Sequence, residues 1–191
     1  MPEVPRFGWR LLLASTVLAL LAATATFVLL DDGPSEQNVD DGAIPIPLVP
    51  DTGAVEPDAA RFTEFDGTEV ALASLRGGPV VVNFFASYCT PCITEMPALE
   101  EVHQQLGDQV TFLGLAVADR EDEASELIER TGVTYRTAQD RDSSVITALG
   151  GSRLPTTVLL AADGSIAARH SGQLDADDLR QLLADELGIR P

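Results

Sequence analysis

The chain has no lysine, and only two cysteines and two histidines among its 191 residues. Without lysine, Schiff-base chemistry at an ε-amino group is excluded. The two histidines, His103 and His170, stand far apart and lack the paired spacing of zinc modules, so we expect no metal site. We interpret both as ordinary surface or core residues.

Positive charge is also scarce. Twelve arginines face 30 acidic residues, which gives a formal net charge of −18. A surface this acidic repels phosphate groups, and no basic stripe runs through the folded part, so nucleic acid is excluded as a partner. The acidity itself is most simply explained by solubility.

One long segment lacks charge altogether. Residues 11–30 are uncharged and rich in leucine, alanine and valine. A helix of this length spans a hydrocarbon layer of about 30 Å. Arg6 and Arg10 precede the segment, and Asp31 and Asp32 follow it. This asymmetry predicts a cytoplasmic N-terminus and an exported remainder of the chain.

Two interpretations of this segment stay open. We predict that residues 1–30 form a retained, single-pass anchor in a bacterial cell membrane, with the rest of the chain on the extracytoplasmic side. The alternative is a signal peptide cleaved after Ala23-Thr24-Ala25, a small-residue site. The apolar run continues past that site through residues 27–30, which favours the anchor. Either outcome exports residues 31–191.

Residues 31–58 have the composition of a linker. They contain 8 acidic residues, no basic residue and five prolines. Self-repulsion and fixed proline torsions predict an extended, poorly ordered stalk. The alternating Ile44-Pro45-Ile46-Pro47 pattern argues against a strand paired with the domain. We expect the folded domain over residues 59–191.

Strand and helix patterns alternate along this domain. Two nearly continuous apolar segments, residues 79–85 and 110–117, predict strands that are buried on both faces. Asp66-Gly67 predicts a hairpin turn between strands at 61–64 and 68–71. Further strands are expected at 135–138, 156–161 and 165–170, and helices from the cysteine motif to 106 and at 121–130, 145–149 and 176–187. This order predicts an α/β sandwich with a mixed sheet.

The two cysteines lie together, in Cys89-Thr90-Pro91-Cys92, directly after the first buried strand and at the start of the next helix. Unpaired N–H groups and the positive end of the helix dipole favour a thiolate there, so the pKa of a cysteine falls below about 8.5. One helical turn brings the two sulfurs within bonding distance. We expect Cys89, at the exposed start, to be the nucleophile and Cys92 to be the resolving thiol.

Two other interpretations of the pair compete with redox chemistry. A structural disulfide, in a binding module without catalysis, is plausible in an exported protein. It would close a loop of only two residues, however, and would restrict the unfolded chain less than a long-range bridge. A zinc site would need two more ligands. We therefore favour a redox-active pair.

The cysteine motif and the strand before it resemble a known family. Residues 80–92 resemble the active-site segment of the thioredoxin superfamily, and the extension through Glu95 and Pro97 gives a C-x-x-C-x-x-E-x-P pattern. This pattern resembles the membrane-anchored thioredoxin-like reductases of the TlpA and ResA type. Similar family features are a cis-proline loop at 153–157 and an N-terminal hairpin with its entry loop at 65–67 and 75–77. The resemblance covers about residues 60–188. It implies a thioredoxin-like three-layer sandwich with an N-terminal β-hairpin extension.

The resemblance also implies roles for single residues. Pro155 would be cis and face the cysteines, and the backbone of Leu154 would pair with an extended substrate. Tyr88 takes the place of the usual tryptophan at the substrate surface. The catalytic residues would then be Cys89, Cys92 and a third residue on the same helix.

That third residue is Glu95, one turn beyond Cys92. A partly buried carboxylate there could exchange a proton with Cys92. Asn83 stands where thioredoxins carry an acid, which leaves Glu95 as the nearest proton carrier. The alternative for Glu95 is an ordinary solvent-facing helix residue.

The resemblance implies that the protein reduces disulfides in exported proteins. One example is the disulfide between the haem-attachment cysteines of apocytochrome c, which is reduced during cytochrome c biogenesis. Electrons would come from a membrane thiol donor, without a cofactor. An oxidase or isomerase that inserts disulfides is the alternative, since direction depends on the reduction potential. Peroxidase relatives place a P-x-x-x-T-x-x-C run at the catalytic cysteine, and none precedes Cys89.

Overall fold

A computed structural model describes residues 44–45 and 59–191 of the chain. Its centre is a parallel pair of strands, β4 (Val80–Phe85) and β5 (Thr111–Val117), in which Val80 lies opposite Thr111. Every side chain of β4 is buried. This burial explains the nearly continuous apolar sequence, because a strand covered on both faces has no solvent side on which to alternate polar residues.

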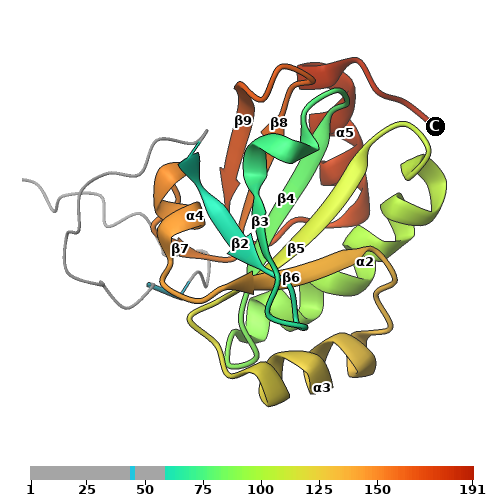
Figure 1. Cartoon of the computed structure of the whole chain (residues 1–191). Coiled ribbons are helices and arrows are strands. Elements are labelled where there is room, and N and C mark those ends of the chain that lie inside the picture. Colours follow the sequence, from blue (N-terminus) through green and yellow to red (C-terminus); the bar gives the residue numbers. More distant parts are fainter. Residues whose placement is uncertain (1–43, 46–58) are drawn as a thin grey trace, which may run out of the picture. The chain divides into compact units, whose positions relative to one another are not determined.

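These two strands lie within a seven-stranded sheet of order β3-β2-β6-β5-β4-β8-β9 (Figure 1). β6 is parallel to β5, whereas β8 is antiparallel to β4, and β9 to β8. The sheet is therefore mixed, as predicted. The other strands of this sheet are β2 (Arg61–Thr63), β3 (Glu69–Ala71), β6 (Arg136–Asp140), β8 (Thr156–Leu160) and β9 (Ile166–Ser171).

The N-terminal hairpin is confirmed at the predicted turn. Gly67 has φ +88°, in the left-handed region that favours glycine. The side chain of Asp66 accepts a hydrogen bond of 2.8 Å from the backbone N–H of Thr68. Strand β2 joins the main sheet beside β6, where Thr63 lies opposite Gln139. The hairpin therefore extends the sheet at one edge.

The helices form around the sheet where the patterns placed them. α2 packs against both α3 and α5, whereas the short α4 packs against β2 and β6. Figure 1 shows α2 running behind β5 and β6. The bounds are η2 (Leu72–Leu75, a 3-10 turn), α2 (Thr90–Leu106), α3 (Glu121–Thr131), α4 (Ser144–Ala148) and α5 (Ala176–Leu187).

A second, two-stranded sheet pairs β1 (Ile44–Pro45) with β7 (Arg153–Leu154). The strands are antiparallel, with Ile44 opposite Leu154. The expectation that the Ile-Pro repeat would not pair with the domain is therefore wrong at these two residues. Prolines at alternate positions remove N–H groups from one edge of a strand only, so the other edge can still pair.

The rest of the predicted anchor and linker, residues 1–43 and 46–58, lies outside the described residues. Within the described ranges, no helix is long and apolar enough to cross a membrane. The predicted spanning segment, residues 11–30, is not among them. The anchor and the linker therefore stay predictions.

Candidate active site

The two cysteines form a disulfide at the N-terminus of α2. Cys89 is the N-cap residue, with extended backbone torsions, and its Sγ accepts a hydrogen bond of 3.3 Å from the backbone N–H of Cys92. Pro91 occupies the first turn, where its missing N–H costs no helical bond. The strand-to-helix junction therefore places one sulfur where helix N–H groups and the dipole favour negative charge.

The exposure of this pair differs from the prediction. Cys89 is 0% exposed and Cys92 is 1% exposed, so the expectation of an exposed nucleophile is wrong for the disulfide form. Both sulfurs belong to the apolar core cluster, which also contains Met96 and Leu154. The residue that reaches solvent is Tyr88, which is 47% exposed. In the disulfide form, neither cysteine is open to solvent.

The loop before β8 lies at the same edge of the sheet. The Leu154–Pro155 peptide is cis, as the resemblance implies. Thr156 pairs with Phe84 near the end of β4, so the preceding Pro155 lies beside the segment that leads into Cys89. The register thus brings the cis-proline loop next to the cysteine motif.

Local hydrogen bonds hold this loop in place. The Pro155 carbonyl accepts a bond of 2.9 Å from the N–H of Gly172, and the Thr156 hydroxyl donates a bond of 2.7 Å to the Arg153 carbonyl. Leu154 is fully buried, whereas Arg153 is exposed. The backbone of β7 is therefore fixed before any client arrives. Whether it binds substrate stays a prediction.

Glu95 is buried, with 1% of its surface exposed, which excludes the solvent-facing alternative. Its Oε1 accepts a bond of 3.3 Å from the Thr157 hydroxyl, and that hydroxyl accepts a bond of 3.1 Å from Asn83 Nδ2. Asn83 and Thr157 lie opposite each other in the β4–β8 pairing. A continuous polar chain therefore crosses the core from the sheet to α2.

Burial raises the pKa of Glu95 to about 8, although hydrogen bonds from the Leu174 backbone, Thr157 and Asn83 lower it in part. Desolvation wins because an isolated carboxylate loses more hydration than these neutral donors return. Near neutral pH the group is mostly protonated and can both give and take a proton. Glu95 lies on α2 three residues, or about one helical turn, after Cys92.

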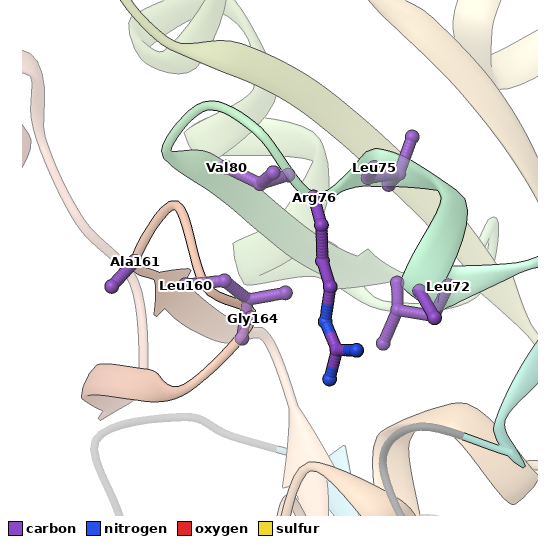
Figure 2. Close-up of a pocket in the computed structure, with 8 residues that line it drawn as sticks. Leu72, Leu75, Arg76, Val80, Leu160, Ala161 and Gly164 are labelled. Atoms are coloured by element: carbon purple, nitrogen blue, oxygen red, sulfur yellow. The ribbon is translucent and has the colours of Figure 1, made fainter.

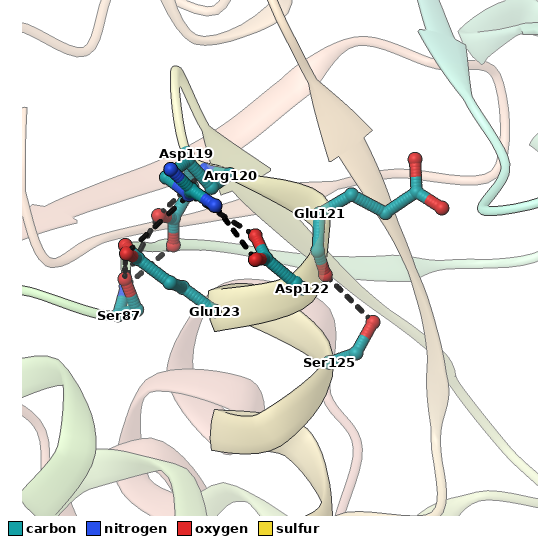
Figure 3. Close-up of polar contacts among 7 residues, drawn as sticks. All are labelled: Ser87, Asp119, Arg120, Glu121, Asp122, Glu123 and Ser125. Carbon is teal, nitrogen blue, oxygen red and sulfur yellow. Dashed lines mark hydrogen bonds and ion pairs between the residues drawn. The ribbon is translucent and has the colours of Figure 1, made fainter.

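Asp119 is a site residue that the sequence did not single out. Its Oδ2 accepts a bond of 2.5 Å from the backbone N–H of Ser87, and its Oδ1 accepts a bond of 2.8 Å from the Ser87 hydroxyl (Figure 3). Glu123 Oε2 lies 3.4 Å from the same hydroxyl. Ser87 stands two residues before Cys89, so this carboxylate fixes the approach to the disulfide.

Asp119 also acts on Tyr88. Burial and then the charge of Asp119 raise the pKa of Tyr88 above its usual range. Asp119 follows β5, and Cys89 follows the parallel strand β4. The carboxyl ends of parallel strands lie at the same edge of a sheet. An acidic residue just past β5 could therefore have predicted that Asp119 lies near the cysteine motif.

Two other predicted or visible features lie outside this site. His103 packs edge-on against Phe112, at 5.3 Å between ring centroids, and against Tyr135, at 5.7 Å.

A small hollow lined by Leu72, Arg76 and Gly164, among others, lies at the amino end of β4 (Figure 2). The cysteines follow the opposite end of that strand. In the described ranges, no three His, Cys, Asp or Glu side chains are grouped to hold a metal ion.

A C-x-x-C disulfide at a helix N-terminus, beside a cis-proline loop in this mixed sheet, defines a thiol–disulfide oxidoreductase with a thioredoxin-like fold. The Redoxin family model matches residues 50–184. The chain belongs to this family, as a ResA/TlpA-type member of the thioredoxin superfamily.

Individual relatives and solved structures are similar to this chain over most of the described domain. The chain is 31% identical over 134 residues to the thiol-disulfide oxidoreductase ResA of Geobacillus thermodenitrificans, covering 69% of this chain and 75% of that one. A DsbF homologue from Corynebacterium diphtheriae superposes with a TM-score of 0.60 at 26% identity, over 73% of this chain and 98% of the other. A secreted Mycobacterium tuberculosis disulfide oxidoreductase shares the fold, with a TM-score of 0.61 at 23% identity, over 67% and 96%.

Proposed function

We propose that this oxidoreductase reduces disulfides in exported proteins, with Cys89 as the attacking and Cys92 as the resolving thiol. The Cys89 thiolate attacks a client disulfide, a Cys89–client bond forms, and one client sulfur leaves and takes a proton. Cys92 then attacks Cys89, releases the second client thiol and closes the disulfide. Two electrons pass to the client in each cycle. The Cys89–Cys92 disulfide is the product of that cycle.

The observation that carries this proposal is the buried Glu95 one turn beyond Cys92. Its carboxylate form takes the proton that Cys92 must lose before it attacks Cys89. Burial also disfavours a lasting charge on Cys92, and an ionised Glu95 opposes such a charge further. Strong oxidants are oxidising because their reduced form is stabilised. Burial and Glu95 instead disfavour the thiolate of Cys92, which supports a reductant rather than an oxidant.

The setting outside the cytoplasm belongs to the same proposal. The uncharged segment 11–30, preceded by Arg6 and Arg10, supports a single-pass anchor with the domain outside the cell membrane. The acidic segment 31–58 supports a spacer between membrane and domain. A membrane thiol carrier would then return electrons to the disulfide. The clients are extended chains with paired cysteines, such as apocytochrome c before haem attachment. Tyr88, Leu154 and Pro155 would form the surface that receives them.

Trapping tests the two-step cycle. In the Cys92→Ser variant the mixed disulfide on Cys89 has no resolving thiol, so client adducts should accumulate and be released by a reductant. The matched Cys89→Ser variant should trap few or none. Absence of adducts on both variants in a client-rich exported extract would favour a non-catalytic module. Equal trapping on both would contradict the proposed order of attack.

A further inference from the structure

The short strand β7 has only one strand partner in the described part of the chain, and that partner comes from the chain's own N-terminal region. Ile44 lies opposite Leu154, and Pro45 lies opposite Arg153. β7 immediately precedes the cis peptide at Pro155, beside the cysteine motif. The edge next to the disulfide is therefore already paired with an extended segment.

Edges of this kind bind extended peptides. A peptide that adds a strand gains main-chain hydrogen bonds in a register set by the edge. Only one segment can occupy a given stretch of this edge at a time, because the N–H groups that point to the edge donate to one neighbouring strand. The burial of both cysteines in this same form, at 0% and 1% exposure, agrees with a closed site.

The sequence around β1 suits a strand that pairs on one side only. N–H groups of successive residues point to opposite edges of a strand, so prolines at 45 and 47 remove donors from one edge and leave the other intact. Such a strand can pair with β7 yet offers no edge for a further chain.

We propose that Ile44–Pro45 is an intramolecular competitor that occupies the client edge at β7 and must leave before an extended client binds. This inference rests on the proposed function, since it gives that edge to the client. The 15 residues from 46 to 60 can span up to about 50 Å when extended, so they allow the segment both to dock and to withdraw.

Tethering makes even weak pairing effective. A tether of about 15 residues gives an effective concentration of the order of 1 mM, so a strand with an intrinsic dissociation constant of about 0.1 mM would occupy the edge about 90% of the time. A client that needs the open form would then bind about tenfold more weakly than to a permanently open edge. Release of β1 should therefore lower KM about tenfold and leave kcat within about twofold.

The test uses the full chain in detergent and two matched dipeptide replacements. Ile44→Gly with Pro45→Ser alters β1, and Val49→Gly with Pro50→Ser alters an equivalent apolar–proline pair of the same linker. The substrate is a short synthetic peptide closed by one disulfide. We expect KM to fall about tenfold for the first variant only. An unchanged KM, or an equal fall in both variants, would overturn the proposal.

A second readout needs no activity. Backbone proton contacts between Ile44 and Leu154, measured by nuclear Overhauser effects in the labelled full chain, should appear in the parent and in the Val49 and Pro50 variant. They should vanish when Ile44 and Pro45 are replaced, and when excess peptide is added. If no chain reduces the peptide, the proposed function fails, whereas the presence or absence of these contacts still decides whether β1 holds the edge. Contacts that persist in excess peptide would contradict competition.

Discussion

The hydroxyl of Thr157 donates a hydrogen bond of 3.3 Å to the carboxyl group of Glu95, and so ties the central sheet to the helix that carries the disulfide. Asn83 completes the chain from the neighbouring strand. An acid at this place stays uncharged through most of the neutral range because burial raises its pKa to about 8. A protonatable carboxyl group therefore lies inside the core, three residues along α2 from Cys92.

Glu95→Gln should remove a pH dependence from resolution of the mixed disulfide. In the parent protein, the rate at which Cys92 attacks a Cys89–peptide disulfide should rise through the pKa of Glu95, about 8, as the carboxylate form appears. The glutamine variant lacks this base, so its inflection should be absent and its rate lower by about 10² near pH 8. Stopped-flow measurement of peptide release across this pH range checks the prediction.

A matched control lies on the same helix. Glu101→Gln changes an exposed carboxylate of α2 that pairs with Arg180. It should leave the profile unchanged. An inflection that survives Glu95→Gln would remove Glu95 from the proton path.

The same acid should make stability depend on pH. Its pKa in the folded chain, about 8, exceeds its ordinary value of 4.5, so the unfolded chain ionises first. The free energy of unfolding should therefore fall as pH rises from about 4.5 to about 8, by at most about 1.4 kcal/mol for each pKa unit, and stay level above that. Urea unfolding of the oxidised protein at about pH 5 and about pH 9 gives the slope.

Glu95→Gln should flatten this part of the curve, so the variant gains stability relative to the parent as the solution becomes basic. Asp140 is a second buried acid, whose pKa burial raises to about 6, and its contribution should be the same in both proteins. The difference between the two curves isolates Glu95. A difference that does not change with pH would show that the carboxyl is ionised throughout.

Asp119→Ala should loosen the segment before Cys89. The change removes the acceptors of two bonds from Ser87, which we expect to cost about 1–3 kcal/mol in unfolding free energy. It also removes the charge that raises the pKa of Tyr88, so that pKa should fall. Ultraviolet titration can follow it, because the chain has only two tyrosines and burial moves the pKa of Tyr135 far above the accessible range.

The exposed neighbour Asp122 provides the control, since its carboxylate pairs with Arg120 and not with Ser87. Asp122→Ala should leave the Tyr88 titration and the stability nearly unchanged. If Asp119→Ala moved neither, Asp119 would have no positioning role.

Local patterns predicted the parts of the fold that depend on local chemistry. The apolar segment 79–85 became β4, one residue shorter, because continuous burial needs continuous apolar sequence. The Asp66-Gly67 turn formed because glycine accepts its positive φ. The strand expected at 135–138 runs instead to Asp140. The polar end of this strand is buried, and the Asp140 carboxylate accepts hydrogen bonds from the N–H groups of Val145 and Ile146.

The remaining features depend on contacts between distant segments. Ser87 and Asp119 are 32 residues apart, and no pattern in either segment encodes their bond. Cys89 is buried in a core cluster that draws residues from distant segments, Leu154 among them, so its own helix does not determine its exposure. The pairing of Ile44 with Leu154 also contradicted a local rule about proline, because that rule ignores which edge of the strand is used.

The reduction potential of the Cys89–Cys92 pair tests the central claim most directly. The oxidised protein would be equilibrated in thiol–disulfide buffers of known potential, and the reduced fraction counted by alkylation and mass spectrometry. We predict a value near that of a cellular reductant such as thioredoxin, about −270 mV, because the surroundings of Cys92 do not stabilise its thiolate. A value near that of a strong oxidant, about −120 mV, would contradict the reductase assignment and favour an oxidase.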